Sequence, residues 1–383
     1  MTRLRVADSV SRVNGNKEKV LVAMSGGVDS SVAALILVQQ GYDVAGAFMK
    51  NWTGNCDWKA ERRDALRVAA KLGILLHTFD FEDEYRLRVY DYMIREYELG
   101  RTPNPDVMCN REVKFDMLLK AADELGCAYL ATGHYARTLT VASSPQRGEV
   151  PSRARRRGVA IGLLKGVDDS KDQSYFLCRL GQKELSRAMF PVGGMKKSEV
   201  RAMAAEADLP TAEKKDSQGL CFVGKVDFPI FLKERLKPKR GNIVTTAGNI
   251  VGEHDGVWFY TIGQREGLGI GGGVPMYIVE RRIDTNELIV AVGDDDPALF
   301  SSSITVSDVH WVSGVSPSFP FSCSAKIRYR HPDASCVVSG EGKNVIVHFN
   351  NPQRAVAPGQ FIVFYAGDEL MGSGVIEKEE TPI

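Results

Sequence analysis

The sequence of 383 residues contains no Cys-x-x-Cys pair, and its seven cysteines are an odd number without the spacing of a zinc site. These absences argue against a disulfide framework and against a structural metal centre. They favour a reducing compartment, in which most cysteines are small buried side chains. A reactive role for any one cysteine therefore needs support of its own.

Long apolar runs and a strong net charge are missing too. No run approaches the roughly 18 residues that span a bilayer, and residues 1–19 lack the apolar segment of a secretory signal. The net charge is +1, so any contact with nucleic acid must come from local patches. We expect a cytoplasmic globular protein of two or three domains. A mitochondrial transit peptide is the alternative at the N-terminus, which leaves the bacterial cytoplasm and an organelle both open.

The stretch SGGVDSS (25–31) lies between two apolar runs, KVLVAM (19–24) and VAALILV (32–38). This order predicts a strand, a tight loop and the start of a helix. Backbone N–H groups, serine hydroxyls and the helix dipole would form an anion-binding cradle there, beside the carboxylate of Asp29. The lysine of the common phosphate-binding loop is missing from the stretch, so the pattern indicates an anion without saying which one.

The first half of the chain alternates strands with helices. Strands are predicted at 19–24, 42–50, 74–81 and 127–136, and helices at about 29–40, 59–72, 82–100 and 110–125. Such alternation predicts right-handed crossovers and a parallel sheet, whose ligands bind at the carboxyl ends of the strands. SGGVDSS and TGHY (132–135) both lie at such ends.

The second half is β-rich from about residue 240, with turn signals roughly every 8 to 12 residues. We expect a multidomain α/β-plus-β protein: a parallel-sheet nucleotide-binding domain at 17–226, a small central β-rich domain at 227–300 and a C-terminal β-barrel at 301–383. GLGIGG (267–272) fits a dinucleotide-binding pattern by letter, but a strand follows it where a helix is required. Five arginines lie between residues 147 and 157, in a segment that we expect to be a solvated loop of open role.

The stretch GRTPNPDVMCNREVKF (100–115) presents Asp106 and Cys109 three residues apart, about one helical turn, so both could face one site. A cysteine at a helix start near Arg111 and Lys114 is expected to have thiolate character. A buried cysteine at a loop–helix junction explains the same spacing about equally well.

The stretch KKDSQGLCFVG (214–224) places Cys221 at the edge of a polar turn, outside any apolar run. The remaining cysteines are interpreted as structural: Cys127 and Cys178 as packed side chains, and Cys56, Cys323 and Cys336 as bystanders. Arginines beside an aromatic residue in RYRHP (328–332) are a weak RNA-contact pattern.

Eight stretches together resemble the tRNA-specific 2-thiouridylases. They are SGGVDSS, MKNW, GRTPNPDVMCN, ATGHYAR, KDQSYFL, DSQGLCF, TIGQREGLGIGG and PGQ, in one order from about residue 19 to the C-terminus. The cradle without lysine is similar to the loop of N-type ATP pyrophosphatases, which cleave ATP between the α and β phosphates. The resemblance implies that ATP adenylylates C2 of the wobble uridine, position 34, and that persulfide sulfur then forms 2-thiouridine with release of AMP and pyrophosphate.

The resemblance also implies roles for residues. Cys221 would carry the persulfide, Cys109 would be the second thiol, and Asp106 would be a general acid or base. ATP, with Mg²⁺, would be bound by Ala23, Met24, Ser25, Gly26, Gly27, Val28, Asp29, Ser30, Met49 and Gly133. Contacts with tRNA would come from Asn104, Pro105, Asp106, His134, Lys171, Asp172, Gln173, Arg328, Tyr329 and Gln360.

The implied partners are the tRNAs for Lys, Glu and Gln and a persulfide donor, either a cysteine desulfurase or a sulfur-relay protein, acting on a monomer. Two other functions compete with this one. An ATP pyrophosphatase that forms amides on a small molecule would need neither the paired cysteines nor a terminal barrel. A catalytically silent RNA-binding protein would not need the SGGVDSS loop together with Asp106, Cys109 and Cys221.

Overall fold

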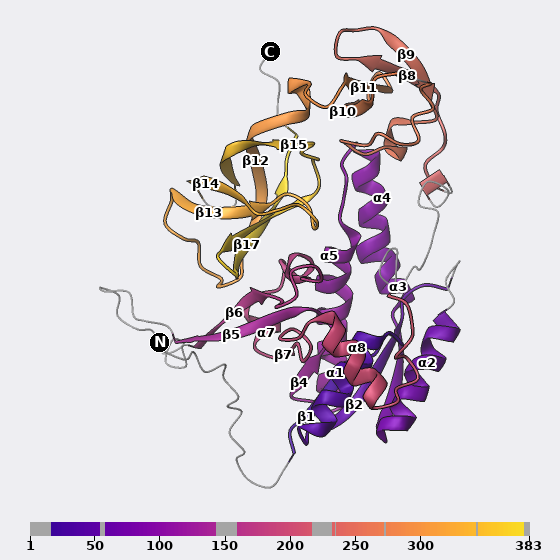
Figure 1. The fold of residues 1–383 in the computed structure, drawn as a ribbon, viewed down its shortest axis with the longest axis vertical. Coiled ribbons are helices and arrows are strands. Elements are labelled where there is room, and N and C mark those ends of the chain that lie inside the picture. Colours follow the sequence, from indigo (N-terminus) through magenta and orange to yellow (C-terminus); the bar gives the residue numbers. More distant parts are fainter. Residues whose placement is uncertain are drawn as a thin grey trace.

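The computed structural model of the chain describes residues 17–53, 58–142, 159–216, 232–233, 235–271, 273–341 and 344–378. An α/β unit at the N-terminal end, a small β-unit and a barrel follow one another along the chain (Figure 1). Cys56, Cys221 and the arginines at 147–157 lie outside the described residues.

The first unit is built on a five-stranded sheet in the order β3-β2-β1-β4-β7. Every pairing in it is parallel, as the alternation of strands and helices predicted. The strands are β1 (Lys19–Ala23), β2 (Asp43–Lys50), β3 (Leu75–Asp80), β4 (Tyr129–Ala131) and β7 (Ala188–Met189). Because the order reverses at β1, a crevice for ligands is expected at the carboxyl ends of β1 and β4.

Helices cover both faces of this sheet. Val20 and Val22 pack with α1 and α2, whereas Leu21 belongs to the core formed with the helical run at 105–124. This alternation explains why β1 is apolar throughout, since each face of the strand is buried. The helices are α1 (Val28–Gln39), α2 (Trp58–Leu72), α3 (Glu82–Tyr85), α4 (Asp91–Glu98), α5 (Pro105–Cys109), α6 (Asp116–Glu124), α7 (Gln182–Leu185) and α8 (Lys197–Glu206).

The helix expected at 110–125 begins earlier than its sequence suggested. Pro105 occupies its first turn and the side chain of Asn104 accepts a hydrogen bond from the N–H of Val107, 3.2 Å away. A π-helical turn at Asn110–Phe115 then joins α5 to α6. Cys109 therefore lies more than one turn inside a helical run, and the expected position at a helix start is wrong.

The central unit is a four-stranded sheet in the order β10-β11-β8-β9, in which only the β11–β8 pairing is parallel. Its strands are β8 (Gly241–Thr245), β9 (Ile250–His254), β10 (Met276–Arg282) and β11 (Glu287–Val292). The described part of GLGIGG precedes β10, a strand, as the sequence indicated.

The last unit is a closed barrel of six strands in the order β12-β15-β14-β13-β16-β17, closed by pairing between β12 and β17. The strands are β12 (Phe300–Trp311), β13 (Phe321–Lys326), β14 (Ala334–Glu341), β15 (Asn344–Arg354), β16 (Phe361–Ala366) and β17 (Glu369–Ile376). A hairpin of β5 (Ala136–Ala142) and β6 (Val159–Lys165) joins this sheet, because β6 pairs with β17 (Figure 1). The expected parallel-sheet unit, central β-unit and barrel are thus confirmed.

The barrel and the α/β unit share one hydrophobic core, which contains both Leu130 of β4 and Phe361 of β16. Polar contacts reinforce it: Tyr175 donates from its hydroxyl to the carbonyl of Phe361 at 2.8 Å, and Arg179 pairs with Asp308 at 2.7 Å. Within the described parts of the chain, no helix has the length and apolarity to cross a membrane.

Gly133 is expected to tolerate no side chain. A Cβ atom there would lie 2.6 Å from the backbone nitrogen of Ser30 and 2.7 Å from the carbonyl carbon of Asp29, so the first turn of α1 would have to shift. We predict that Gly133→Ala lowers the free energy of unfolding by about 1–3 kcal/mol, as overpacking does. Gly194→Ala is the matched control, because its Cβ would meet nothing within 4 Å. Equal urea midpoints for the two variants would contradict this prediction.

Candidate functional site

The SGGVDSS loop turns directly from β1 into α1. Gly26 has a φ of +75°, and a Cβ there would lie 2.3 Å from the carbonyl oxygen of Glu61 in α2. Ser30 and Ser31 donate from their hydroxyls to the carbonyl of Gly27, at 3.1 and 2.8 Å, which fixes the first turn of the helix. The loop therefore presents a helix N-terminus at the crevice between β1 and β4, as expected for an anion site.

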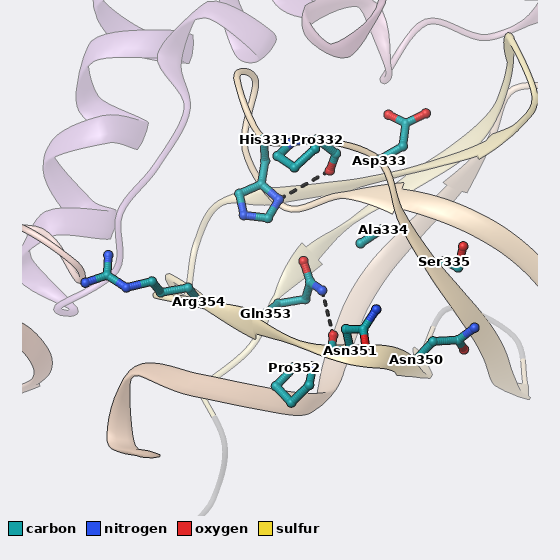
Figure 2. Close-up of a pocket in the computed structure, with 10 residues that line it drawn as sticks. All are labelled: His331, Pro332, Asp333, Ala334, Ser335, Asn350, Asn351, Pro352, Gln353 and Arg354. Carbon is teal, nitrogen blue, oxygen red and sulfur yellow. Dashed lines mark hydrogen bonds between the residues drawn. The ribbon is translucent and has the colours of Figure 1, made fainter. Parts of the chain in front are cut away.

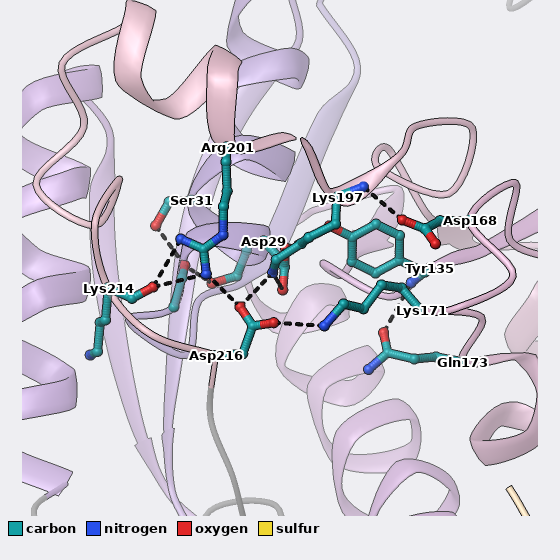
Figure 3. Close-up of polar contacts among 12 residues, drawn as sticks. Asp29, Ser31, Tyr135, Asp168, Lys171, Gln173, Lys197, Arg201, Lys214 and Asp216 are labelled. Carbon is teal, nitrogen blue, oxygen red and sulfur yellow. Dashed lines mark hydrogen bonds and ion pairs between the residues drawn. The ribbon is translucent and has the colours of Figure 1, made fainter. Parts of the chain in front are cut away.

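The loop carries no lysine, but α8 provides one. Lys197 lies with its ammonium group 2.7 and 2.8 Å from the two carboxylate oxygens of Asp29, and Tyr135 donates to Asp29 at 2.8 Å (Figure 3). Lys197 is separated from Asp29 by 168 residues, so no local spacing could have identified it. The cation that a phosphate group requires thus reaches the cradle from another helix.

Further cations surround the cradle and are balanced by carboxylates. Asp216 contacts Lys171 at 2.8 Å, Lys197 at 2.9 Å and Arg201 at 2.8 Å (Figure 3). Burial raises the pKa of Asp216, but the hydrogen bonds and charges of Lys171 and Lys197 outweigh it and hold this pKa well below its usual range. Lys214 similarly contacts two carboxylates of α2 and donates to the carbonyl of Gly26 at 3.0 Å.

This arrangement suits a polyphosphate. Lysines bind phosphate as point charges, and the cradle adds backbone donors. Among the described residues, no group of three or more His, Cys, Asp or Glu side chains could hold a metal ion by itself. Mg²⁺ usually takes one or two carboxylates together with substrate phosphates, so Asp29 fits as a partial ligand. The site therefore fits a nucleotide with Mg²⁺ better than a resident metal.

The cradle connects directly to the cysteine-bearing helix through His134. Its Nε2 lies 3.3 Å from the ammonium of Lys114, and its Nδ1 lies 2.7 Å from the hydroxyl of Thr132. Burial lowers the pKa of His134 well below its usual value, and the charge of Lys114 lowers it further. A neutral ring accepts from Lys114 at Nε2, which leaves the proton on Nδ1 to donate to Thr132.

Cys109 is buried, with 1% of its surface exposed, in the core shared by the two units. Two cations were expected beside Cys109. Arg111 forms an ion pair with Glu112, and Lys114 donates to the side chain of Asn110 at 2.7 Å. Asp106 lies in the first turn of the same short helix and is half-buried. The alternative of a buried cysteine thus describes this conformation, and any reaction at Cys109 requires the site to open.

Lys171, Asp172 and Gln173 face the protein interior as much as the solvent. Lys171 binds Asp216 at 2.8 Å, and Gln173 exchanges two hydrogen bonds with the backbone of Tyr135, at 2.8 and 3.0 Å. Asp172 is 5% exposed and accepts from the N–H groups of Gly166 and Ser174. Of the three, Lys171 has a partly exposed side chain whose charged end is bound to Asp216.

The candidate residues of the barrel contact the loop before α5 and the central unit. Gln360 donates from its amide to the carbonyls of Thr102 and Pro103, at 3.0 and 3.1 Å. Arg328 donates to the carbonyl of Ile262 at 2.8 Å, and its burial lowers its pKa. The ring of Tyr329 lies 4.3 Å from that of Phe176. These contacts bring three parts of the chain together around residues 102–106.

The sequence did not single out Asn51. It follows β2 at the carboxyl edge of the sheet, is 1% exposed, and neither amide atom has a hydrogen-bond partner among the residues that the structure describes. An unpaired buried amide costs roughly 1–3 kcal/mol, so such groups are candidates for ligand contacts. The other nucleotide candidates Ala23, Met24, Val28 and Met49 are buried, and only their backbones can reach a ligand.

A hollow of about 450 Å³ on the barrel contains none of the cradle residues. It is lined by residues 331–335, which lead into β14, and by residues 350–354 of β15 (Figure 2). The side chain of Gln353 points into it and donates to the carbonyl of Asn351 (Figure 2). The hollow adjoins the turn that carries Arg328 and Tyr329, and it is separate from the cradle.

The buried state of His134 predicts a specific pH dependence. Below its unfolded pKa of 6.5, the unfolded chain binds a proton that the folded protein does not. Stability should therefore fall as the pH falls from 6.5, by up to roughly 1.4 kcal/mol per pH unit from this residue. Urea unfolding of the wild type and of His134→Gln from pH 5.5 to 7.5 measures the difference. A constant difference across that range would contradict a neutral buried His134.

Three models of one protein family match in order: a tRNA methyl transferase HUP domain at 18–225, a tRNA methyl transferase PRC-barrel domain at 230–292 and an aminomethyltransferase beta-barrel domain at 301–376. A tRNA-specific 2-thiouridylase MnmA of Pseudomonas fluorescens (strain Pf0-1) is 46% identical over 375 residues, with 95% of this chain and 96% of that protein covered. The enzyme of the same name from Geobacillus thermodenitrificans is 47% identical over 371 residues, with 95% of each chain covered.

Among solved structures, a complex of a 4-thiouridine synthetase with RNA and bound ATP matches with a TM-score of 0.34 and 18% identity, over 54% of this chain and 45% of that one. That likeness is too weak to bear on activity. The relatives that match from end to end decide the assignment, because their identity is high and no large part of either chain is left uncovered. The chain belongs to the tRNA-specific 2-thiouridylase family.

Proposed function

We propose that this chain performs ATP-dependent 2-thiolation of tRNA at the wobble uridine, position 34. The observation that carries the proposal is the continuous contact from the cradle to the thiol-bearing helix. Gly133 lies against Ser30, and the adjacent His134 contacts Lys114, five residues after Cys109. A nucleotide in the cradle and a base near Cys109 would therefore meet at the same edge of the sheet.

The first half of the reaction is activation of the base. The C2 oxygen of uridine is a poor leaving group, so it attacks the α-phosphate of ATP and pyrophosphate departs. The cradle and Lys197 are suited to hold the departing pyrophosphate, and Asp29 fits a partial ligand of Mg²⁺, which would neutralise phosphate charge. Asn51, at the end of β2, offers an unpaired amide to either base.

The second half is delivery of sulfur. The terminal sulfur of a persulfide on Cys221 attacks C2, and AMP leaves with the original oxygen. The thiolate of Cys109 then attacks the sulfur of Cys221, which releases 2-thiouridine and leaves a Cys109–Cys221 disulfide. An external thiol must reduce this disulfide before the next cycle. Asp106, in the first turn of α5, would move a proton at the uridine.

We divide the chain into domains at 17–226, 227–300 and 301–383, and we propose that the last of them, the barrel, binds tRNA. The start of α5 at Asn104–Asp106 would receive the flipped uridine. Gln360 of the barrel donates to the carbonyls of Thr102 and Pro103 just before it, which supports this position. Lys171 would offer its charge to phosphate by leaving Asp216. Local rearrangement would also be needed for contact with RNA by His134, Asp172, Gln173, Arg328 and Tyr329. The proposed partners are the tRNAs for Lys, Glu and Gln and a persulfide donor, either a cysteine desulfurase or a sulfur-relay protein. The enzyme is proposed to act as a monomer in the cytoplasm.

The direct test is release of pyrophosphate from ATP in the presence and absence of tRNA, with 2-thiouridine measured in the same samples. We expect both products only when tRNA and a persulfide donor are supplied. Pyrophosphate release that is driven by a small molecule in place of tRNA would favour an amide-forming enzyme. No release under any condition would favour a silent RNA-binding protein.

The two cysteines are predicted to fail at different steps. Cys221→Ser should take up no label from a cysteine desulfurase and ³⁵S-cysteine, because the thiol proposed to accept the sulfur is gone. Cys109→Ser should load label on Cys221 but form no 2-thiouridine, because nothing resolves the persulfide. Protein-bound label and thiolated tRNA are counted separately. Full thiolation by Cys109→Ser would overturn the two-thiol mechanism.

Asp29→Asn is predicted to abolish adenylylation while the fold remains intact. The amide keeps the shape and can still accept from Tyr135 and Lys197, but it removes the charge offered to Mg²⁺. Exchange of labelled pyrophosphate into ATP, with tRNA present, should fall at least a hundredfold. Asp208→Asn, an exposed carboxylate paired with Lys71, is the control and should exchange normally. Normal exchange by Asp29→Asn would remove this residue from the site.

A further inference from the structure

Two cysteines that no sequence pattern connects lie opposite each other in the barrel. Cys323 of β13 and Cys336 of β14 are direct partners in the antiparallel register, with Ser322 opposite Val337 on one side and Ser324 opposite Ser335 on the other. Their sulfur atoms are 3.6 Å apart, and both are free thiols. Neither cysteine belongs to the cradle or to the proposed thiol mechanism.

This geometry already meets most of what a disulfide requires. Residues directly opposite in an antiparallel pair have Cα atoms about 4.5–5.5 Å apart, which falls within the range of about 4.4–6.8 Å seen in disulfides. The bond then needs the sulfur atoms to approach to about 2.05 Å, which side-chain rotation and a small shift of the strands can provide. No rearrangement of the barrel is necessary.

The two thiols differ in exposure and in charge stabilisation. Cys323 is partly exposed, whereas Cys336 is 2% exposed. The hydrogen bond between the two thiols lowers the pKa of Cys336, although burial opposes that effect, and it raises the pKa of Cys323. Solvent thus reaches one sulfur, while the other is favoured as a thiolate, a division that suits thiol–disulfide exchange.

We propose that Cys323 and Cys336 form a redox-active dithiol site that closes to a disulfide when it meets a small-molecule disulfide such as oxidised glutathione. Cys323, the more exposed of the two, passes its proton to the thiolate of Cys336 along their hydrogen bond as its sulfur attacks one glutathione sulfur, which forms a mixed disulfide and releases one glutathione thiolate. The thiolate of Cys336 then attacks the sulfur of Cys323 and displaces the second glutathione. The two cysteines lose two protons and two electrons, and one oxidised glutathione becomes two reduced molecules.

The site lies at the base of the turn that carries Arg328 and Tyr329. A disulfide would join the middle of β13 to the first half of β14 and restrain residues 327–333, which connect the two strands. If the proposed function is correct, oxidation therefore acts on a part of the barrel that is assigned to tRNA. We expect the oxidised protein to bind tRNA at least threefold more weakly, because Arg328 and Tyr329 must leave their contacts with Ile262 and Phe176 to reach RNA.

The experiment uses the full-length protein in buffers with graded ratios of reduced to oxidised glutathione. Free thiols are blocked with iodoacetamide, and trypsin cleaves after Lys326, Arg328 and Arg330, so the disulfide links two separate peptides. Cys127 and Cys178 are internal controls, because they are buried and burial raises the pKa of each. We expect the linked peptide to dominate at oxidising ratios while both controls remain alkylated.

Each outcome is decisive. Alkylated Cys323 and Cys336 at oxidising ratios, or glutathione on Cys323 without a link, would overturn the site. The variants Cys323→Ser and Cys336→Ala, tested separately, should both lose the linked peptide, so misfolding of one does not decide the result. A linked peptide with unchanged tRNA affinity would overturn the effect on binding and leave the site standing. Loss of thiolation in reduced protein concerns the proposed function alone, because both cysteines are then free.

Discussion

The structure depends on a short segment, residues 171–176, that contacts two units at once. On one side, Gln173 exchanges hydrogen bonds with Tyr135, whose hydroxyl donates to Asp29 in the cradle. On the other side, Ser174 contacts the hydroxyl of Tyr365 and Tyr175 donates to Phe361, both in the barrel. The position of the cradle carboxylate and the position of the barrel are thus set by neighbouring residues of one segment.

The contact of residues 171–176 with both units is stabilised by buried polar groups that form hydrogen bonds with one another. Asp172 is 5% exposed, yet it accepts from two backbone N–H groups and from the hydroxyl of Ser174, and Lys326 lies 3.8 Å away. A buried carboxylate without such partners would cost several kcal/mol. Because residues 172–175 contact both units, a shift of the barrel is expected to move Gln173 and, through Tyr135, the carboxylate of Asp29. Such a shift would couple RNA binding to nucleotide chemistry.

The sequence predicted what local patterns can encode. Continuous apolar runs predicted β1 and β2, and the glycine–serine stretch between two apolar runs predicted the tight turn from β1 into α1. The sequence did not predict features that depend on residues far apart along the chain. Lys197 reaches Asp29 across 168 residues, and the opposition of Cys323 and Cys336 depends on strand register. The helix was expected only from residue 110, although proline at the first turn and a capping asparagine favour the observed start at Asn104 and Pro105.

The pairing of β6 with β17 has a consequence for how the protein is made. Leu164 pairs with Glu369, which is 205 residues later in the chain (369 minus 164). At the usual rates of synthesis, roughly 5–20 residues per second, β6 leaves the ribosome about 10–40 s before its partner exists. During that interval an unpaired strand edge and half of a shared core are exposed to other chains. The nascent protein is therefore expected to depend on chaperones until its last strand is complete.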